Sequence, residues 1–251
     1  MLQTIKRCLK KIASPIIGNG LPANLHKDDQ ALITRIRDER ITYLSDAKLA
    51  ELANTCRQIE QQALPGIFIE AGCALGGSAV LIGSIKNKQR AFYVYDVFGM
   101  IPPPSDHDTD DVHDRYKTIV EGKSTGIDGD EYYGYKPNLY EVVQDNLKRF
   151  GVDYKKDSVW LIKGLLQDTM HITQPVALAH VDVDWYEPVM TCLQRVFPRL
   201  VVGGSIILDD YHDWGGCRQA TDEYLKTLHG QFALDDSAGS LKVTRTRAAL
   251  N

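Results

Sequence analysis

Short apolar runs alternate with amphipathic segments along the chain from residue 67 onward. The apolar runs have the length of buried strands, and they lie at residues 67–73, 92–97, 159–163, 176–183 and 205–208. Between them, apolar residues recur every three or four positions, as on one face of a helix, at residues 78–87, 139–150, 186–200 and 217–229. Strands that alternate with helices predict an α/β fold with a mostly parallel sheet covered on both faces.

Smaller elements flank this pattern at both ends. Residues 232–234 and 241–244 are apolar runs on either side of a polar turn, which predicts an antiparallel hairpin at one edge of the sheet. Ser45 is a suitable N-cap for an amphipathic helix that ends before Pro65. We therefore expect a helical N-terminal extension at residues 1–64 and an α/β domain at residues 65–251.

The predicted helix at residues 139–150 carries signals at both of its ends. Asn138 is placed to cap its first turn, and Glu141 would complete a capping box three residues later. Gly151 follows as a C-terminal stop.

The first 27 residues contain five basic side chains and no acidic one. Their apolar residues recur along one face of a helix: Leu2, Ile5, Leu9, Ile12 and Ile16. Such a helix can lie on a membrane surface, direct a protein to an organelle, or dock on the protein body or a second subunit. We expect docking, and with it a homo-oligomer of two or more subunits.

The composition excludes several classes of protein. The 251 residues include 29 basic and 33 acidic side chains, a formal net charge of −4, which argues against general affinity for nucleic acid. The longest apolar stretch, residues 200–208, is too short to cross a bilayer. The five cysteines are scattered without a C-x-x-C pair, so we expect free thiols in a cytoplasmic protein.

Residues 98–137 interrupt the alternation of strands and helices. This segment is longer than an ordinary connection, and it carries nine acidic and four basic residues. It leaves the C-terminal end of a strand, which is the edge where open α/β sheets bind ligands. We expect a lid over a binding site. His107 and His113 with their acidic neighbours imitate a metal site, but we expect a solvated acidic loop instead.

The first strand runs into a helix through a turn with glycines at positions 72, 76 and 77. Glycines allow a sharp turn and close approach of the backbone to a ligand, which the N–H groups of the following helix can also contact. The spacing differs from the dinucleotide fingerprint G-x-G-x-x-G, which disfavours an oxidoreductase. Asp96 ends the second strand, where an acid accepts hydrogen bonds from a ribose diol.

Four carboxylates follow the fourth and fifth predicted strands: Asp182, Asp184, Asp209 and Asp210. These strands should be neighbours, so the like charges would crowd together unless a cation joins them. Oxygen ligands of this kind suit Mg²⁺ or a similar divalent ion. On a regular strand Asp182 and Asp184 would face the same side, so that one could bind the ion while the other reaches a substrate.

Several motifs in order resemble the macrocin O-methyltransferase family. They comprise Glu70-x-Gly72-x-x-x-Gly76-Gly77-Ser78, Tyr95-Asp96-x-Phe98-Gly99-Met100, Lys163-Gly164 through Asp168-Thr169, His180-x-Asp182-x-Asp184-x-Tyr186, Asp209-Asp210-Tyr211 and Trp214-x-Gly216-Cys217-Arg218-x-Ala220. The resemblance covers residues 32–245 and implies a class I methyltransferase fold, which is Rossmann-like, with S-adenosylmethionine as cofactor. One departure is Cys73-Ala74-Leu75, which replaces a bulkier and more basic stretch before the double glycine.

The resemblance also implies roles for individual residues. It places Mg²⁺ on Asp182, Asp209 and Asp210 and makes Asp184 the general base. We expect the cofactor to contact Glu70, Gly72, Gly76, Ser78, Asp96, Gly164 and Leu165.

The expected function is metal-dependent O-methylation of a small molecule or natural product. An alcohol is a weak nucleophile, so its proton must pass to a base; His212 is the rival of Asp184 for this role. Two adjacent oxygens would chelate the cation best, which favours a vicinal diol of a sugar, or a catechol. The alternative is a non-catalytic nucleoside-binding module that holds a partner through its N-terminal helix.

Overall fold

The structure is a computed structural model, and it describes residues 20–22 and 25–247. The helix expected at residues 2–16 lies outside this range. In the described residues a seven-stranded sheet has the order β3-β2-β1-β4-β5-β7-β6. The strands are β1 (Ile67–Ala71), β2 (Phe92–Asp96), β3 (Val159–Lys163), β4 (Val176–Val181), β5 (Leu200–Leu208), β6 (Phe232–Asp235) and β7 (Leu241–Arg245).

The sheet confirms the predicted architecture. The first five strands pair with one another in parallel. β7 is antiparallel to both β5 and β6, so the C-terminal hairpin forms the expected antiparallel edge. All five predicted inner strands are present, although β5 begins five residues earlier than the apolar run at 205–208 indicated.

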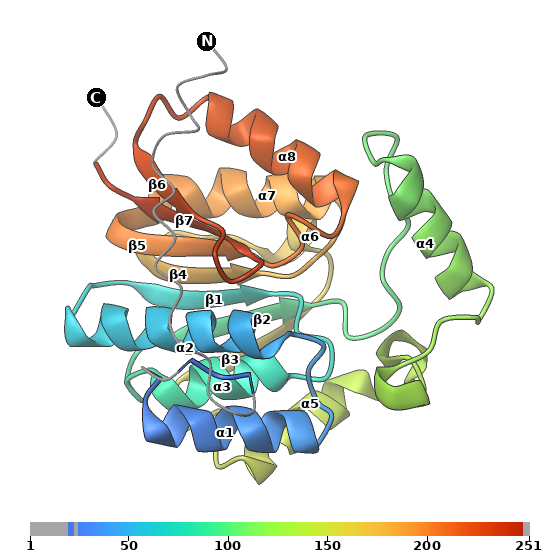
Figure 1. The fold of residues 1–251 in the computed structure, drawn as a ribbon, viewed down its shortest axis with the longest axis horizontal. Coiled ribbons are helices and arrows are strands. Elements are labelled where there is room, and N and C mark those ends of the chain that lie inside the picture. The colour runs from blue at the N-terminus through green and yellow to red at the C-terminus, as the bar shows by residue number, and fades with distance from the viewer. Residues whose placement is uncertain (1–19, 23–24, 248–251) are drawn as a thin grey trace.

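Helices cover both faces of the sheet (Figure 1). One layer contains α1 (Lys27–Asp38), α2 (Asp46–Gln61), α3 (Gly77–Ile85) and α5 (Leu139–Arg149), and the other contains α6 (Leu166–Thr169), α7 (Tyr186–Val196) and α8 (Gly215–Lys226). Every residue of β1 is buried, and its successive side chains enter opposite layers. Phe68 belongs to the core shared with α2 and α3, while Ile69 belongs to the core shared with α7. A central strand of a parallel sheet is buried in this way on both sides.

The described part of the N-terminal extension is helical. α2 begins after Ser45, whose side chain accepts a hydrogen bond from the Lys48 N–H, as predicted. α1 is a helix that the sequence pattern did not reveal, and it buries Ile33 and Ile36. Both helices pack against α3, so the extension shares the core of the α/β domain.

The capping prediction for α5 is half correct. Asn138 occupies the N-cap position, but its backbone has φ −116° and ψ 33°, and its side chain makes no capping hydrogen bond. The expected capping box is therefore wrong, because an N-cap side chain reaches the first turn from an extended backbone. Gly151 ends the helix as predicted: its φ is +82°, and the Val152 N–H donates to the Leu147 carbonyl oxygen at 2.9 Å.

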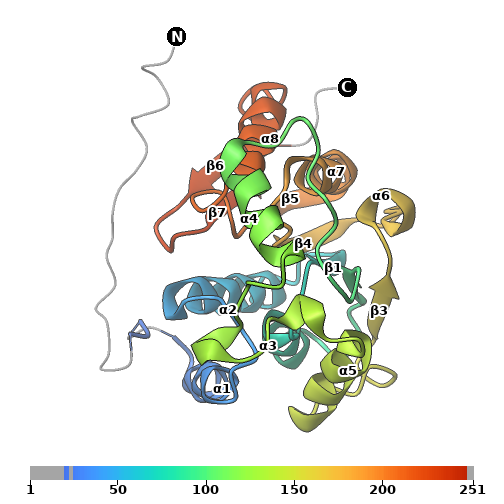
Figure 2. The same cartoon turned by 90° about the vertical axis from the view of Figure 1, so that its right-hand side faces the viewer.

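Residues 98–137 contain more regular structure than the sequence pattern indicated. They form α4 (Asp110–Val120) and two short 3-10 helices, η2 (Ile127–Gly129) and η3 (Tyr133–Tyr135); a third, η4 (Phe197–Arg199), follows α7. Figure 2 shows α4 crossing the C-terminal edge of the sheet between the two helical layers. Only Val112 and Ile119 of α4 are buried, so its apolar face is too narrow to stand out among the acidic residues.

Candidate active site

The candidate site lies at the C-terminal edge of β1, β2, β4 and β5. Ala71 pairs with Val181, and Val181 pairs with Leu208, so β1, β4 and β5 end side by side. The glycine turn after β1 and the carboxylates after β4 and β5 are thereby brought to one edge, as the sequence predicted.

The turn after β1 depends on Gly72. This residue has a φ of +80°, and a Cβ atom there would meet the backbone of Asp182, with the carbonyl carbon at 2.8 Å. Only glycine adopts this conformation freely and allows such close packing. Gly76 also has a positive φ, but its Cα faces Val143 of α5, and Ser78 is buried within α3. Of these three positions, Gly72 borders the two cavities described below, and Gly76 and Ser78 border neither of them.

Asp96 connects the turns that follow β1 and β2. Its two carboxylate oxygens accept hydrogen bonds from the N–H groups of Cys73 at 2.7 Å and Phe98 at 2.6 Å. Burial raises the pKa of Asp96, and these hydrogen bonds partly oppose the rise. The carboxylate is therefore fixed in position at the strand tip.

Glu70 lies deeper in the molecule than the sequence suggested. Its side chain is fully buried, and its Oε1 lies 3.1 Å from Nδ1 of His180 on β4. Glu70 borders neither cavity. The pKa of His180 is raised to about 10: burial opposes the charged ring, but the carboxylates of Asp209 and Glu70 outweigh it.

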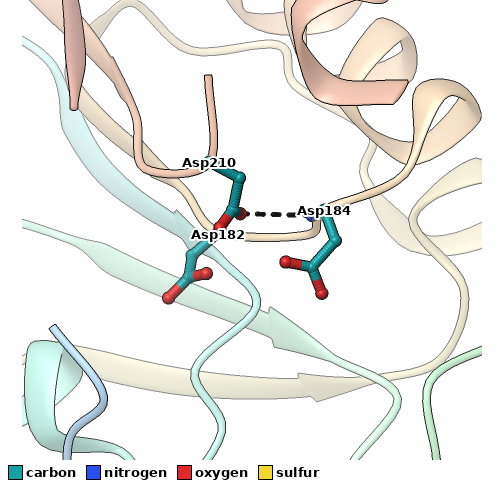
Figure 3. Close-up of side chains that lie close together, drawn as sticks. All are labelled: Asp182, Asp184 and Asp210. Carbon is teal, nitrogen blue, oxygen red and sulfur yellow. Dashed lines mark hydrogen bonds between the residues drawn. The ribbon is translucent and has the colours of Figure 1, made fainter. Parts of the chain in front are cut away.

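Three aspartates, which we call the acid cluster, meet at the strand tips (Figure 3). Asp182, Asp184 and Asp210 each offer a carboxylate oxygen, and these oxygens lie within 4.8 Å of one another. β4 ends at Val181, so the regular strand through Asp184 that the sequence suggested is absent. A turn with Asp184 at φ +57° brings the carboxylates together instead, and the Asp184 N–H donates to Asp210 Oδ2 at 3.3 Å.

Asp209 belongs to a second, overlapping group with Asp210 and Asp213. Lys48 of α2 contacts it: Nζ lies 3.0 Å from Asp209 Oδ2 and 2.8 Å from Asp213 Oδ2. The other oxygen of Asp209 is buried without a hydrogen-bond partner in the described part of the chain, 4.0 Å from His180 Nε2. Lys48 was not predicted from the sequence, because nothing in its local pattern links it to a residue 161 positions away.

Burial and mutual repulsion set the protonation of these acids. The pKa of Asp182 and that of Asp210 are both raised, first by burial and then by neighbouring carboxylates. Burial raises the pKa of Asp184 to about 6. Asp209 differs: burial would raise its pKa, but the contacts with His180 and Lys48 lower it.

Two cavities meet at the acid cluster. The first is bordered by Gly72 and Asp96, by residues 101–103 and by Gly164 and Leu165. The second, of about 350 Å³, is bordered by tyrosines, by Lys48 and by the aspartates; this volume is typical of small-molecule sites. Five residues border both cavities: Gly72, Asp96, Tyr133, Asp182 and Asp184.

The segment 98–137 forms walls of both cavities and is attached to α7. Trp185 Nε1 donates to the Pro102 carbonyl oxygen at 3.0 Å, and the Tyr186 N–H donates to Asp108 Oδ1 at 2.7 Å. Farther along the segment, Arg115, Tyr132 and Tyr133 border the second cavity.

The histidines considered in the sequence are placed elsewhere. The His107 ring stacks on Tyr186, with centroids 4.9 Å apart, and His113 is exposed on α4. Neither belongs to a metal-ligating group among the described residues. His212 lies 3.5 Å from Asp236 and borders neither cavity.

The fold defines the class of protein: it is a class I methyltransferase fold. The structure superposes on the O-methyltransferase NovP with a TM-score of 0.68, 22% identity, and coverage of 82% of this chain and 83% of that chain. It also superposes on CalS11, a calicheamicin methyltransferase, with a TM-score of 0.58 and 17% identity over 93% of this chain and 99% of that chain.

Sequence comparison identifies the family. The macrocin-O-methyltransferase (TylF) family model matches residues 36–231. Mycinamicin III 3''-O-methyltransferase from Micromonospora griseorubida is 28% identical over 75% of this chain and 71% of its own length. Demethyldecarbamoylnovobiocin O-methyltransferase from Streptomyces niveus is 25% identical over 82% of this chain and 70% of its own. The chain belongs to the macrocin O-methyltransferase family and is an S-adenosylmethionine-dependent O-methyltransferase, so the non-catalytic alternative is not retained.

No helix in residues 20–22 and 25–247 has the length and apolar character needed to cross a bilayer.

Proposed function

We propose that the enzyme methylates a hydroxyl of a small natural product with the help of a divalent cation such as Mg²⁺. The observation that carries this proposal is the position of Asp182 and Asp184, which border both cavities. A methyl donor in the first cavity and an acceptor hydroxyl in the second would meet at these carboxylates. Methyl transfer depends mainly on holding the two reactants in line.

The first cavity is our proposed site for S-adenosylmethionine. Gly72 and Asp96 both border it, at the turns after two parallel strands, which is the edge where open α/β sheets bind ligands. Each Asp96 oxygen has lone pairs beyond those used by its backbone partners, so it can also accept from a ribose hydroxyl. Gly164 and Leu165 would border the adenine. For Glu70, Gly76 and Ser78, contact with the cofactor stays a prediction.

The carboxylates after β4 and β5 fit a divalent cation. Carboxylate oxygens are ligands that Mg²⁺ prefers, and the buried Asp209 Oδ1 has no hydrogen-bond partner within the described residues. We propose that Asp182, Asp209 and Asp210 hold the ion. When bound, a divalent cation lowers the pKa of a hydroxyl that contacts it and fixes that oxygen.

Asp184 is our proposed general base. Its pKa of about 6 makes it a better match for proton transfer near neutral pH than a fully solvated carboxyl group. The hydrogen bond from the Asp184 N–H to Asp210 stabilises the turn that carries Asp184. His212 is the weaker candidate, because it borders neither cavity.

The second cavity suits a ring that carries hydroxyls. Tyr43, Tyr132 and Tyr133 form an aromatic wall, with ring centroids 5.7 Å apart for Tyr43 and Tyr133 and 4.5 Å apart for Tyr132 and Tyr133. The aspartates lie along the same cavity. A relative named for 4'-O-methylation of a rhamnosyl-tetracenomycin supports a sugar hydroxyl as acceptor. A vicinal diol of a sugar, or a catechol, would offer the cation two adjacent oxygens.

Three organisational features complete the proposal. We propose that residues 98–137 act as a lid, since they border both cavities. We propose a division into the extension at residues 1–64 and the catalytic domain at residues 65–251. A cytoplasmic location is supported by the free thiols of the described cysteines, while homo-oligomerisation stays a prediction.

The experiment is a methyl-transfer assay with S-adenosylmethionine and a panel of vicinal-diol glycosides and catechols. Asp182→Ala and EDTA should each abolish turnover, because both remove the cation. Asp184→Asn should lower kcat by about 100-fold or more while cofactor affinity in calorimetry is unchanged.

Asp236→Asn is the matched control. This aspartate pairs with His212 away from both cavities, so its loss should leave turnover intact. Full activity in EDTA would refute the role of the cation, and full activity of Asp184→Asn would refute the proposed base.

A further inference from the structure

Lys48 places an ammonium group among the carboxylates at the tip of β5. Its Nζ donates to Asp209 Oδ2 and to the Asp209 carbonyl oxygen, both at 3.0 Å, and to Asp213 Oδ2 at 2.8 Å. The Lys48 side chain is only 14% exposed. All three of its donors are used within this group, so the ammonium position is well defined.

Carboxylates outnumber basic side chains around the second cavity, which Lys48 borders. Five carboxylates border the second cavity: Asp182, Asp184, Asp209, Asp210 and Asp213. Among the described residues, the lysine and arginine side chains that border this cavity are Lys48 and Arg115. Lys48 pairs with two of the five carboxylates, and the acid cluster has no ion-pair partner in the described part of the chain.

The contact with Lys48 also fixes the direction of Asp209. One of its oxygens is bound to Nζ, and the other is buried without a hydrogen-bond partner. A proposed cation ligand is thereby shared with a lysine that belongs to the N-terminal extension.

We infer that Lys48 is a positioning residue of the proposed cation site, which holds Asp209 toward α2 and weakens the affinity of the carboxylates for a divalent ion. This inference rests on the metal dependence proposed above. A fixed positive charge beside the ligands repels an incoming cation. An ion that uses Asp209 must also compete with the ammonium group for that carboxylate.

Titration of the metal-free enzyme with Mn²⁺, followed by electron paramagnetic resonance of the free ion, tests the inference. Lys48→Met should bind Mn²⁺ about tenfold more tightly than the wild type, because a like charge is removed and Asp209 is released. Lys48→Arg keeps the charge and should restore the affinity of the wild type. Lys48→Gln removes the charge but keeps an NH₂ group that can donate to Asp209, and it should also bind Mn²⁺ more tightly than the wild type. This second variant tests the inference if Lys48→Met folds poorly.

Lys242→Met is the matched control. Lys242 also pairs with an acid of α2, its Nζ lying 2.7 Å from Glu51 Oε1, but it borders neither cavity. Its loss should destabilise the fold without changing Mn²⁺ affinity.

The outcomes separate this inference from the proposed function. Unchanged or weaker binding by both Lys48→Met and Lys48→Gln overturns the role of Lys48 and leaves metal dependence standing. Binding by Lys48→Met alone supports that role but contradicts metal dependence of the natural enzyme. Absence of Mn²⁺ binding by every variant overturns both.

Discussion

Gly72→Ala is expected to damage both the stability and the activity of the enzyme. The residue has a φ of +80°, and an added methyl group would meet the carbonyl group of Asp182 inside van der Waals contact. The Asp182 N–H in turn donates to the Ala71 carbonyl oxygen at 2.8 Å. The substitution therefore pushes the ends of β1 and β4 apart where the acid cluster begins.

Two costs add up in this variant. A left-handed conformation costs an alanine about 1–2 kcal/mol, and overpacking in a rigid environment costs about 1–3 kcal/mol more. We therefore expect a loss of about 2–5 kcal/mol in the free energy of unfolding. A displacement of a reacting group by about 1 Å can lower turnover by about 100-fold, so kcat should fall as well.

Gly122→Ala separates the two costs. Gly122 has a φ of +71°, and a Cβ atom there would meet nothing within 4 Å. The Gly122→Ala variant should lose only the conformational part of the free energy of unfolding, about 1–2 kcal/mol, and its kcat should be unchanged. Denaturant unfolding and initial rates measure both variants. If Gly72→Ala were as stable and as active as Gly122→Ala, the argument from close packing would be wrong.

Two further substitutions test the buried carboxylates. In Asp96→Asn the NH₂ group must face the N–H of Cys73 or Phe98, because both oxygens of Asp96 accept hydrogen bonds. Two donors would then face each other, so calorimetry should show cofactor affinity reduced by about tenfold or more. Glu70→Gln breaks a buried ion pair with His180 and should cost about 3 kcal/mol near pH 6. The pKa of His180 is about 10 in the folded protein and about 6.5 when unfolded, so the stabilisation is complete below the lower value and is lost as pH rises through the higher one. Denaturant unfolding of the metal-free protein should therefore show a smaller loss at pH 10 than at pH 6, and an equal loss at both would contradict this assignment.

The sheet could be predicted because its strands are buried on both faces and bounded by turns. The same periodicity did not reveal α1 or α4. α4 buries only Val112 and Ile119, and its acidic first turn resembles a solvated loop. The capping box predicted from Asn138 was wrong because capping depends on backbone angles, which residue type alone does not determine.

The site could be predicted in part for a similar reason. Parallel strand tips gather at one edge, so Asp182, Asp184 and Asp210 were expected together, although a turn and not a strand aligns them. Lys48 could not be found in this way, because α2 reaches the site only through tertiary packing. The burial of Glu70 against His180 was equally hidden, since the sequence gives no sign of how deep a strand residue lies when it stands two positions before the turn at Gly72.

The bonds from Trp185 and Tyr186 to residues 102 and 108 bear on the order of events in turnover. These bonds hold residues 102–108, which border the first cavity, whereas α4 begins two residues later, at Asp110. If α4 moved outward from this anchor, and so released the hydrogen bond between its Asp111 and the Gly215 N–H of α8, the second cavity would open while the first stayed closed. With the cofactor and the acceptor in the cavities proposed above, acceptor and methylated product would exchange through the second cavity, and the spent cofactor would leave the first only after the bonds of Trp185 and Tyr186 break.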